Sequence, residues 1–350
     1  INALPEELYN ITLVLLDSDN EYAYRLKKNV NIVQLTFNSS FAKSLVSMYA
    51  FPAKVLKKLS VNSFIAYYDF ISNCVTNVFE KTYDIAIDFY GYGSFVTAFL
   101  ATKIQAKKKA TWLHDEKPYW MKSVQKYLCE YDKIYGVSQA VVDAFCREYP
   151  HYKDKAAVFY NVIDIEEIKR KSEQDEIIPF KESFNIVTVG RLTEQKGYDI
   201  AIKAASILKK RKINFAWYAI GGGRDEKKLK KLVEKYCLEN QFVFLGRKKN
   251  PYPYMKHCDL YVQPSRHEGY VITLVEARAL CLPILSSDIP SAREQIQDGI
   301  NGYVAELSAE DLADKIEYLY NNPSQRKKTV EYLKEHPIDF STELLKLEII

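Results

Sequence analysis

Residues 184–223 read FNIVTVGRLTEQKGYDIAIKAASILKKRKINFAWYAIGGG, and this stretch decides the fold of the chain. Phe184–Gly190 is apolar on both faces, Tyr198–Lys210 repeats apolar residues at helical spacing, and Phe215–Ile220 is a second apolar run. Short strands that are apolar on both faces indicate a parallel sheet that is covered on both sides. The stretch therefore predicts a strand, a helix and a second, parallel strand.

The same alternation of apolar strands and amphipathic helices continues on both sides of this stretch. Towards the C-terminus we expect strands at Phe242–Gly246, Leu260–Pro264 and Pro283–Ser287, and helices at Asp225–Asn240, Val271–Cys281 and Ala309–Asn321. Towards the N-terminus we expect strands at Tyr9–Asp17, Val30–Thr36, Tyr83–Tyr90, Ala110–His114, Lys133–Ser138 and Ala156–Asn161, and helices at Ser94–Thr102 and Gln139–Glu148. This order predicts two successive doubly wound α/β domains, in which ligands bind at the carboxyl ends of the strands.

The length of 350 residues and the apolar content of 47% are typical of two globular domains. Glu166–Ser183 is polar and charged, and we expect it to be a linker. We therefore place an N-terminal domain at 1–165, a C-terminal domain at 184–335, and a final segment at 336–350 that returns to the first domain. The opening at Ile1 is typical of the end of a helix, so we expect a strand and a turn before this numbering.

Composition argues against several classes of protein. A net charge of +4 without a basic tail disfavours a nucleic-acid partner. The six cysteines are scattered, with none in a C-x-x-C pair, so we expect reduced thiols and a cytoplasmic location. We find neither a signal peptide nor the run of about 18 apolar residues that a membrane-spanning helix needs.

The strongest local signal is SRHEGYVITLVEA at Ser265–Ala277, where an expected strand gives way to a helix. Glu268 lies in the loop before this helix, and Glu276 lies more than one turn inside it. Backbone amides at the start of the helix can point at an anion, and here they belong to Gly269, Tyr270 and Val271. Two carboxylates beside an anion site can accept hydrogen bonds from sugar hydroxyls. A solvated glutamate and an ordinary helix start remain the alternative.

A second signal is GRLTEQKG, which follows the strand at Phe184–Gly190 and supplies Gly190, Arg191 and Lys196. Two cations in a strand-to-helix loop suit a diphosphate, although such loops are also found solvated. Three glycines around Gly222 follow the next strand and permit a close approach to phosphate or sugar. They do not form G-x-G-x-x-G, which disfavours a dinucleotide site.

His114 ends the expected strand ATWLH and so lies on the ligand edge of the first domain, although a lone histidine is more often structural. The other four histidines lack metal-ligand spacing, and we predict no metal site. Asp17-Ser18-Asp19 matches a short D-x-D motif that binds metal ions in some enzymes, and we interpret it as a polar strand end.

Residues 22–68 form a basic amphipathic segment that has no acidic residue. Such a segment can lie on an anionic membrane surface, and Lys107–Lys109 can add to it. The alternative is a solvated basic face over a core. The first interpretation places the protein peripherally at the inner membrane face.

The motifs VGRLTEQKG, GGG, FLG, SRHEGYVITLVEA and DGINGYV, taken in this order and spacing, resemble the retaining glycosyltransferase family 4, which has the GT-B fold. Glu268 and Glu276 match the E-x7-E pair of that family. The resemblance covers Phe184–Glu306 closely and the first domain more loosely. It implies two Rossmann-like domains that face a central cleft.

The resemblance also implies roles for single residues. Those matching Arg191 and Lys196 hold the donor diphosphate, and the match to Glu276 binds the ribose hydroxyls. The match to Glu268 lies beside the transferred sugar. Further donor contacts fall on His114 near the sugar, on Arg247 at the base, and on Gly190, Gly222, Gly269, Tyr270 and Val271 at the phosphates or sugar. The segment Ser286–Ile296 lacks the glycines that are usual in the family.

The implied reaction moves a hexose from a nucleoside diphosphate sugar to a saccharide or a lipid-linked saccharide, with retention of configuration. A UDP-sugar is the expected donor, and no cofactor or metal is expected, since Arg191, Lys196 and the helix amides can stabilise the leaving diphosphate. The resemblance favours same-face attack, with Glu268 orienting the sugar.

Three alternatives stay open. One is a sugar-nucleotide epimerase of the same architecture, which needs acid and base residues at a sugar carbon. Another is a phosphorylase, which usually needs a lysine for a pyridoxal cofactor and a longer chain. The third is a catalytically silent partner subunit that binds nucleotide sugars. Binding of a nucleotide without turnover would distinguish the silent subunit from a transferase.

Overall fold

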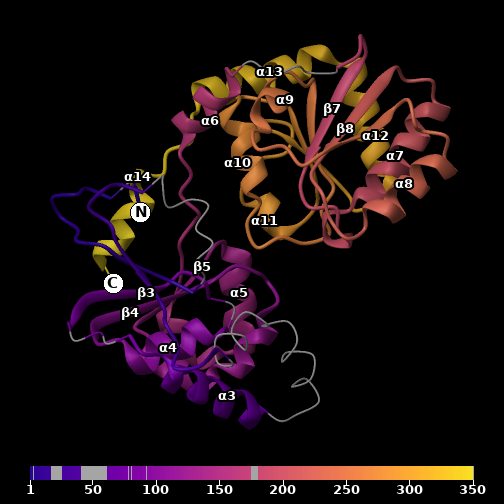
Figure 1. Cartoon of the computed structure of the whole chain (residues 1–350). Coiled ribbons are helices and arrows are strands. Elements are labelled where there is room, and N and C mark those ends of the chain that lie inside the picture. Colours follow the sequence, from indigo (N-terminus) through magenta and orange to yellow (C-terminus); the bar gives the residue numbers. More distant parts are fainter. Residues whose placement is uncertain are drawn as a thin grey trace. The chain divides into compact units, whose positions relative to one another are not determined.

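The computed structural model describes residues 1–2, 4–16, 26–40, 61–77, 79, 81–91, 93–174 and 180–349. The chain divides into two compact units (Figure 1). Unit 1 comprises Ile1–Val137, Val141–Phe159 and Thr342–Ile350, and unit 2 comprises Ser138–Ala140 and Tyr160–Ser341. Each unit has its own parallel β-sheet and is described by itself.

Unit 2 is built on a six-stranded parallel sheet with the order β12-β11-β10-β7-β8-β9. Its strands are β7 (Phe184–Val189), β8 (Phe215–Ile220), β9 (Phe242–Gly246), β10 (Leu260–Gln263), β11 (Ile284–Ser287) and β12 (Tyr303–Ala305). The order reverses direction between β7 and β10, so this sheet is doubly wound. Every residue of β8 is buried, as expected for a strand that is apolar on both faces.

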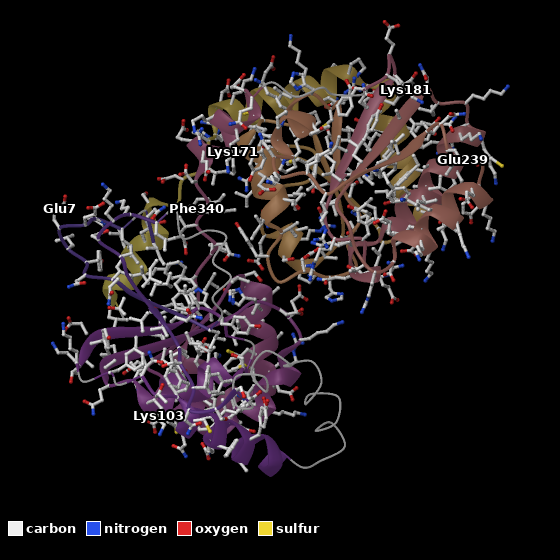
Figure 2. The ribbon with its side chains drawn as sticks, viewed as in Figure 1. Glu7, Lys103, Lys171, Lys181, Glu239 and Phe340 are labelled. Atoms are coloured by element: carbon white, nitrogen blue, oxygen red, sulfur yellow. The ribbon has the colours of Figure 1, made fainter. Side chains whose placement is uncertain are left out.

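Helices cover both faces of this sheet (Figure 1). On one face lie α7 (Tyr198–Lys210), α8 (Glu226–Lys235) and α12 (Ala309–Asn321), which supply Leu208, Leu229 and Leu312 to one buried cluster. On the other face lie α9 (Tyr252–Lys256), α10 (Ile272–Ala279) and α11 (Pro290–Arg293), which supply Met255, Leu274 and Ala292 to a second cluster. Charged side chains such as Lys181 and Glu239 are exposed (Figure 2). The helix α13 (Pro323–Glu335) follows α12.

The stretch Glu166–Ser183, expected as a linker, begins instead with a helix, α6 (Ile165–Ser172). Asp164 caps this helix by accepting a hydrogen bond from the amide of Glu167 at 2.8 Å, and Ile168 is buried. The side-chain amide of Asn250 also binds the carbonyl oxygen of Lys171 at 2.8 Å. One buried isoleucine in a run of charges is too weak a periodic signal, so only packing within unit 2 reveals the helix.

Unit 1 contains a four-stranded parallel sheet with the order β3-β4-β5-β6 and a separate parallel pair, β1-β2. The strands are β1 (Thr12–Leu15), β2 (Asn31–Gln34), β3 (Tyr83–Asp88), β4 (Ala106–Leu113), β5 (Lys133–Gly136) and β6 (Ala156–Val158). Among the described residues of this part of the chain, the helices are α3 (Val61–Cys74), α4 (Phe95–Lys103), α5 (Gln139–Glu148) and α14 (Ser341–Leu345), and 3-10 turns lie at Pro118–Ser123, Gln125–Glu130, Pro150–Lys155 and Lys346–Ile349.

The last residues of the chain belong to unit 1. The Lys346 ammonium donates to the carbonyl oxygen of Val158 at 3.1 Å and pairs with Glu343 at 2.8 Å. The hydroxyl of Tyr135 on β5 donates to the carbonyl oxygen of Lys346 at 3.4 Å. These contacts attach the C-terminal segment to the edge of the sheet that carries β6.

Strand β4 begins four residues before the expected Ala110, so Lys107–Lys109 are strand residues. Lys107 pairs with Asp84 at 2.6 Å and Lys108 pairs with Asp132 at 3.2 Å. These two charges therefore face acidic partners, Asp84 on β3 and Asp132 directly before β5. Most of the basic segment 22–68, and all of Asp17-Ser18-Asp19, lie outside the described residues. Within the described ranges no helix is long and apolar enough to cross a bilayer.

Candidate functional site

The loops that follow β7 and β10 are joined at the carboxyl edge of the unit 2 sheet. The amide of Arg266 donates to the carbonyl oxygen of Gln195 at 2.8 Å, and the side chain of Gln195 returns a hydrogen bond to the carbonyl oxygen of His267 at 3.0 Å. Arg266 also forms a bidentate pair with Asp199, with both distances 2.8 Å. These contacts lock the two loops together.

Between these loops Lys196 and Glu268 form an ion pair. The Lys196 Nζ lies 2.6 Å from the Glu268 Oε1, and the two side chains are 15% and 9% exposed. Because little water surrounds this pair, its two charges are weakly screened. Each charge can therefore act strongly on a bound ligand. The pair joins two residues that are 72 positions apart in the sequence.

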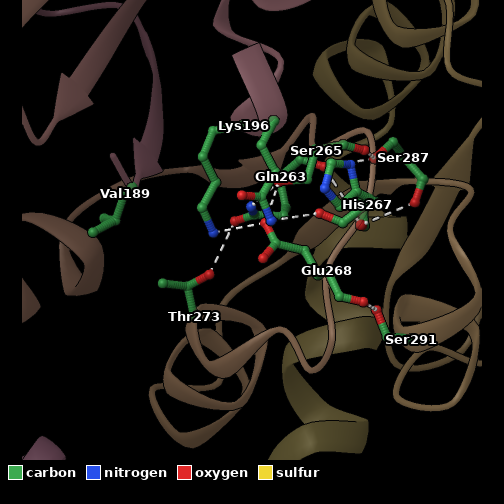
Figure 3. Close-up of polar contacts among 12 residues, drawn as sticks. Val189, Lys196, Gln263, Ser265, His267, Glu268, Thr273, Ser287 and Ser291 are labelled. Carbon is green, nitrogen blue, oxygen red and sulfur yellow. Dashed lines mark hydrogen bonds and ion pairs between the residues drawn. The ribbon is translucent and has the colours of Figure 1, made fainter. Parts of the chain in front are cut away.

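A buried line of polar side chains stands behind Glu268 (Figure 3). Ser265 donates to the Glu268 Oε1 at 2.6 Å, and the side-chain amide of Gln263 donates to the Ser265 Oγ at 2.6 Å. Tyr261 and Thr273 donate to the Gln263 Oε1 at 2.7 and 2.9 Å. The residues from Tyr261 to Ser265 in this line are completely buried, and their mutual hydrogen bonds offset the cost of that burial.

Serine hydroxyls also hold the backbone around Glu268. Ser291 on α11 donates to the carbonyl oxygen of Glu268 at 2.9 Å, and Ser287 donates to the carbonyl oxygen of Ser265 at 2.5 Å (Figure 3). Both serines come from Ser286–Ile296, the segment that lacks the glycines usual in the resembled family. Hydroxyl groups therefore shape the loop in this chain.

Glu276 lies in the middle of α10 and differs from Glu268 in its surroundings. Its Oε1 accepts a hydrogen bond from the hydroxyl of Tyr252 at 3.0 Å. Burial raises the pKa of Glu276 to about 6, and the Tyr252 hydrogen bond opposes part of this rise. A half-buried carboxylate of this kind suits a ligand that donates hydrogen bonds, because these bonds replace the ones from water that burial removes.

Glycines bring the loops after β7 and β8 into contact. The amide of Gly190 donates to the carbonyl oxygen of Ile220, and that of Leu192 donates to the carbonyl oxygen of Gly222, at 3.0 and 3.2 Å. A Cβ atom at Gly221 would lie 1.9 Å from the carbonyl oxygen of Gly190. The close approach therefore requires glycine at Gly221, and it extends the strand pairing past the end of the sheet.

Two arginines at this edge point into solvent. Arg191 and Arg247 are exposed, and in the described part of the chain neither has an ion-pair partner. A Cβ atom at Gly222 would lie 2.9 Å from the Arg247 Nε, so the arginine lies against this glycine. Both guanidinium groups are available to an anionic ligand.

The loop before α10 offers backbone amides. Val271 precedes the helix without a side-chain cap, and among the described residues the amides of Gly269 and Val271 have no protein acceptor. Tyr270 packs its ring against Tyr160, with the ring centroids 5.5 Å apart. The start of α10 therefore presents donors that can receive an anion.

His114 belongs to unit 1, where it follows β4. One ring nitrogen, Nε2, lies 2.8 Å from the carbonyl oxygen of Phe89, and burial lowers the pKa of the histidine. Phe89 and Tyr90 follow the neighbouring strand β3 and are 54% and 53% exposed. The turn that carries them is held by the buried Asp88, whose carboxylate accepts hydrogen bonds from Gly91, Thr97 and Thr111.

The predicted residues of unit 2 thus follow four neighbouring strands, β10, β7, β8 and β9, at one edge of one sheet. Sequence reasoning missed the residues that support them, namely Tyr252, Gln263, Ser265 and Ser291. A polar pair in the buried run LYVQPS was the available signal for Gln263 and Ser265. Within the described residues no group of three or more histidine, cysteine, aspartate or glutamate side chains could hold a metal ion.

Residues 169–336 match the protein family described as Glycosyl transferases group 1. The match includes every predicted site residue of unit 2. An uncharacterised glycosyltransferase of Methanocaldococcus jannaschii is 33% identical over 48% of this chain and 40% of its own length. The N-acetylgalactosamine-N,N'-diacetylbacillosaminyl-diphospho-undecaprenol 4-alpha-N-acetylgalactosaminyltransferase of Campylobacter jejuni is 30% identical over 49% of each chain. Other relatives are named for amylovoran and colanic acid biosynthesis.

The chain therefore spans about half or less of the length of these two relatives. Among solved structures, the Anabaena protein HepE in complex with UDP and glucose superposes with a TM-score of 0.70 at 18% identity, covering 97% of this chain and 90% of that one. The fold is accordingly GT-B, with two Rossmann-like α/β bodies. The matched family and these two relatives are glycosyltransferases.

Proposed function

We propose that the protein is a retaining glycosyltransferase that moves a hexose from a UDP-sugar to a saccharide or lipid-linked saccharide in polysaccharide biosynthesis. The observation that carries this proposal is the Lys196–Glu268 ion pair, which lies at the strand ends within the region that matches the family. A sugar phosphate needs a cation for the phosphate and an acceptor for its hydroxyls, and this pair supplies both groups side by side.

In the proposed reaction, negative charge grows on the diphosphate as its bond to the sugar C1 breaks. We propose that Lys196, Arg191 and the amides before α10 stabilise that charge. A preorganised donor of this kind contributes about 3 kcal/mol to the transition state. These protein groups make a divalent metal unnecessary in the proposal.

Glu268 is proposed to orient the sugar rather than to attack it. Its Oε1 already accepts from Lys196 and Ser265, so the carboxylate is held as a hydrogen-bond acceptor. Same-face attack by the acceptor hydroxyl, with its proton passing to a donor phosphate oxygen, gives retention without a covalent enzyme intermediate. Glu276 is proposed to bind the ribose hydroxyls, which suits its half-buried carboxylate, and Arg247 is proposed to contact the base.

The choice of UDP and hexose is supported by the structural neighbour that holds UDP and glucose. The Campylobacter jejuni relative, named for a diphospho-undecaprenol substrate, supports a lipid-linked acceptor. We propose that unit 1 receives this acceptor at the ends of β3 and β4, where His114 and the exposed Phe89 and Tyr90 lie. We also propose a cytoplasmic protein whose segment 22–68 contacts an anionic membrane.

The test is release of nucleotide from a panel of UDP- and GDP-sugars in the presence of a chelator. We expect slow release from one UDP-hexose, and its loss in Lys196→Ala and Glu276→Ala. Lys230→Ala is the matched control, because Lys230 pairs with Glu226 on the surface of α8 at 2.8 Å. Nucleotide binding without release from any donor would favour the silent partner subunit. No binding at all would refute the proposal.

The membrane proposal is tested separately with vesicles at low salt. We expect sedimentation with vesicles that contain anionic lipid and none with neutral vesicles, because the attraction is electrostatic. Equal binding to both kinds of vesicle would refute it.

A further inference from the structure

We propose that Gln263 and Ser265 are positioning residues for Glu268, and that they form a relay of hydrogen bonds that fixes the orientation of its carboxylate, so that one oxygen is held and the other faces the ligand. The relay itself is a property of the fold, whereas its effect on sugar transfer rests on the proposed function. No role in the reaction was predicted for either residue from the sequence.

The relay follows from the geometry of one strand. Tyr261, Gln263 and Ser265 occupy every second position of β10 and its extension, so their side chains share one face of the sheet. All three are completely buried. Their contacts of 2.7, 2.6 and 2.6 Å run without a gap from the Tyr261 hydroxyl to the Glu268 carboxylate.

The direction of the relay is fixed by which groups have protons to give. The Glu268 carboxylate, paired with Lys196, only accepts, so the single proton of the Ser265 hydroxyl must point at it. Ser265 must then accept from the amide nitrogen of Gln263. The other end of that amide, Oε1, accepts from Tyr261 and Thr273. Every hydrogen bond in the line therefore donates towards the carboxylate.

This arrangement leaves the two oxygens of Glu268 unequal. Oε1 accepts from Ser265 and Lys196, while Oε2 accepts from no donor among the described residues. Tilting the carboxylate out of this plane would weaken both short contacts, and a half-turn would only exchange two equivalent oxygens. The relay consequently keeps Oε2 as the oxygen that meets a ligand hydroxyl, at no cost of reorganisation when the ligand binds.

Buried polar side chains are unusual at positions where apolar side chains could fill the same space. A fully satisfied network of this kind fixes a single arrangement, whereas one missing member leaves its neighbours unpaired. Among the described residues, the side-chain hydrogen bonds of this line run from Tyr261 and Thr273 to the Glu268 carboxylate. Its position therefore matches a function in holding that one carboxylate.

The first experiment reverses the relay and needs no substrate. Gln263→Glu is nearly isosteric but has no proton to donate, so it competes with Glu268 for the Ser265 proton. We expect thermal unfolding several degrees lower for this variant. Adding Glu268→Gln allows the hydrogen bonds of the relay to run in the opposite direction. The double variant should therefore be more stable than the sum of the two single losses predicts.

Ser291→Ala provides the matched control for this cycle. It removes a buried serine hydrogen bond from the backbone of the same residue, Glu268, and leaves the carboxylate contacts intact. Combined with Glu268→Gln it should be additive. Additive behaviour of Gln263→Glu with Glu268→Gln would overturn the relay, whatever the activity of the protein.

The second experiment measures transfer. With a donor that wild type turns over, Ser265→Ala should lower kcat about 10- to 100-fold, as expected for losing one hydrogen bond to a charged group. Binding of UDP alone should stay within twofold, because UDP lacks the sugar that Glu268 meets. Ser265→Thr, which keeps the hydroxyl, should recover most of the rate. Equal losses in Ser265→Ala and Ser265→Thr would refute positioning.

The two proposals fail in different ways. If no nucleotide sugar binds or turns over, the proposed function is wrong, and the stability cycle alone judges the relay. If turnover occurs and Ser265→Ala weakens UDP binding as much as it lowers kcat, the relay supports the general structure of the site and the positioning role is refuted.

Discussion

At the scale of single residues, the two glutamates of the site are held in opposite ways. Glu268 is fixed by a cation and a serine on one oxygen, whereas Glu276 accepts from the neutral hydroxyl of Tyr252 at 3.0 Å. Burial without a cation disfavours the charged form, which is why the pKa of Glu276 rises to about 6. Glu276 is thereby expected to titrate near pH 6 in the free protein.

The affinity for UDP should therefore fall as the pH decreases through about 6. Hydroxyl donors of a ligand favour the ionised carboxylate, so binding is strongest above the pKa of Glu276 and weakens as the carboxylate takes up a proton. Titration calorimetry between pH 5 and pH 8 measures this. Tyr252→Phe removes a hydrogen bond that lowers the pKa, so it should move the midpoint to higher pH. If Glu276→Gln has the same midpoint as wild type, the titration belongs to another group.

Lys196→Ala and Arg191→Ala should both weaken binding of UDP, by about 10- to 100-fold for a charged hydrogen bond. They should differ in stability. Lys196→Ala leaves the buried Glu268 carboxylate without its cation and should lower the free energy of unfolding by about 3 kcal/mol. Arg191 is exposed and has no ion-pair partner among the described residues, so its removal should change stability by less than about 0.5 kcal/mol. Urea unfolding separates the two, and equal stabilities would contradict this account of the pair.

At the scale of elements, the site depends on loops that continue the strand pairing beyond the sheet. After β7 and β8 the backbones stay hydrogen-bonded through Gly190 and Gly222, and the amide of Gly221 donates to the carbonyl oxygen of Gly246 after β9 at 2.9 Å. Three neighbouring strands thus deliver their loops in register. A side chain at the central glycine would separate them.

Gly221→Ala should accordingly lower the free energy of unfolding by about 3 kcal/mol or more, because its Cβ atom would overlap the carbonyl oxygen of Gly190 at 1.9 Å. Gly299→Ala is the matched control. Its backbone also has a positive φ, of 77°, but no atom lies within 4 Å of the added carbon, so only the conformational cost of about 1 kcal/mol applies. Chemical unfolding of both variants measures the difference, and similar losses would show that close approach is not the cause.

At the scale of the whole molecule, the chain begins and ends in unit 1, while unit 2 is inserted between. The returning segment is attached by Lys346, which neutralises the buried Glu343 and binds the end of β6. These C-terminal residues thus contribute to the stability of unit 1, whose other residues lie before position 160. The candidate nucleotide residues all belong to the other unit.

Lys346→Met should therefore lower the free energy of unfolding of unit 1 by about 2 kcal/mol, since it removes the ammonium that pairs with the buried Glu343 and binds the carbonyl oxygen of Val158. UDP affinity should stay within twofold. Lys327→Met is the control, because Lys327 and Glu331 form an exposed pair at 3.8 Å that contributes little. Calorimetric scans with and without UDP test both statements. A large loss of UDP affinity in Lys346→Met would contradict the assignment of the nucleotide residues to unit 2.

Local patterns in the sequence predicted many elements well. The bounds of α5, α7, α12, β8 and β9 agree with the expectation because each contrasts with polar neighbours on both sides. Helix α6 and the short strand β12 were not predicted. In α6 a single buried isoleucine is hidden among charges, and β12 has only three residues, so neither carries a periodic signal of its own.

By itself, the sequence determined the fold class and the identity of the charged groups, because apolar periodicity and strand-end motifs are local properties. It could not determine which of those groups meet. Lys196 and Glu268 are 72 positions apart and pair because β10 lies beside β7, an order set by packing of the whole sheet. Only the tertiary structure decided the relay from Tyr261 to Glu268 and the raised pKa of Glu276, since burial and hydrogen-bond direction arise only when distant segments exclude water together.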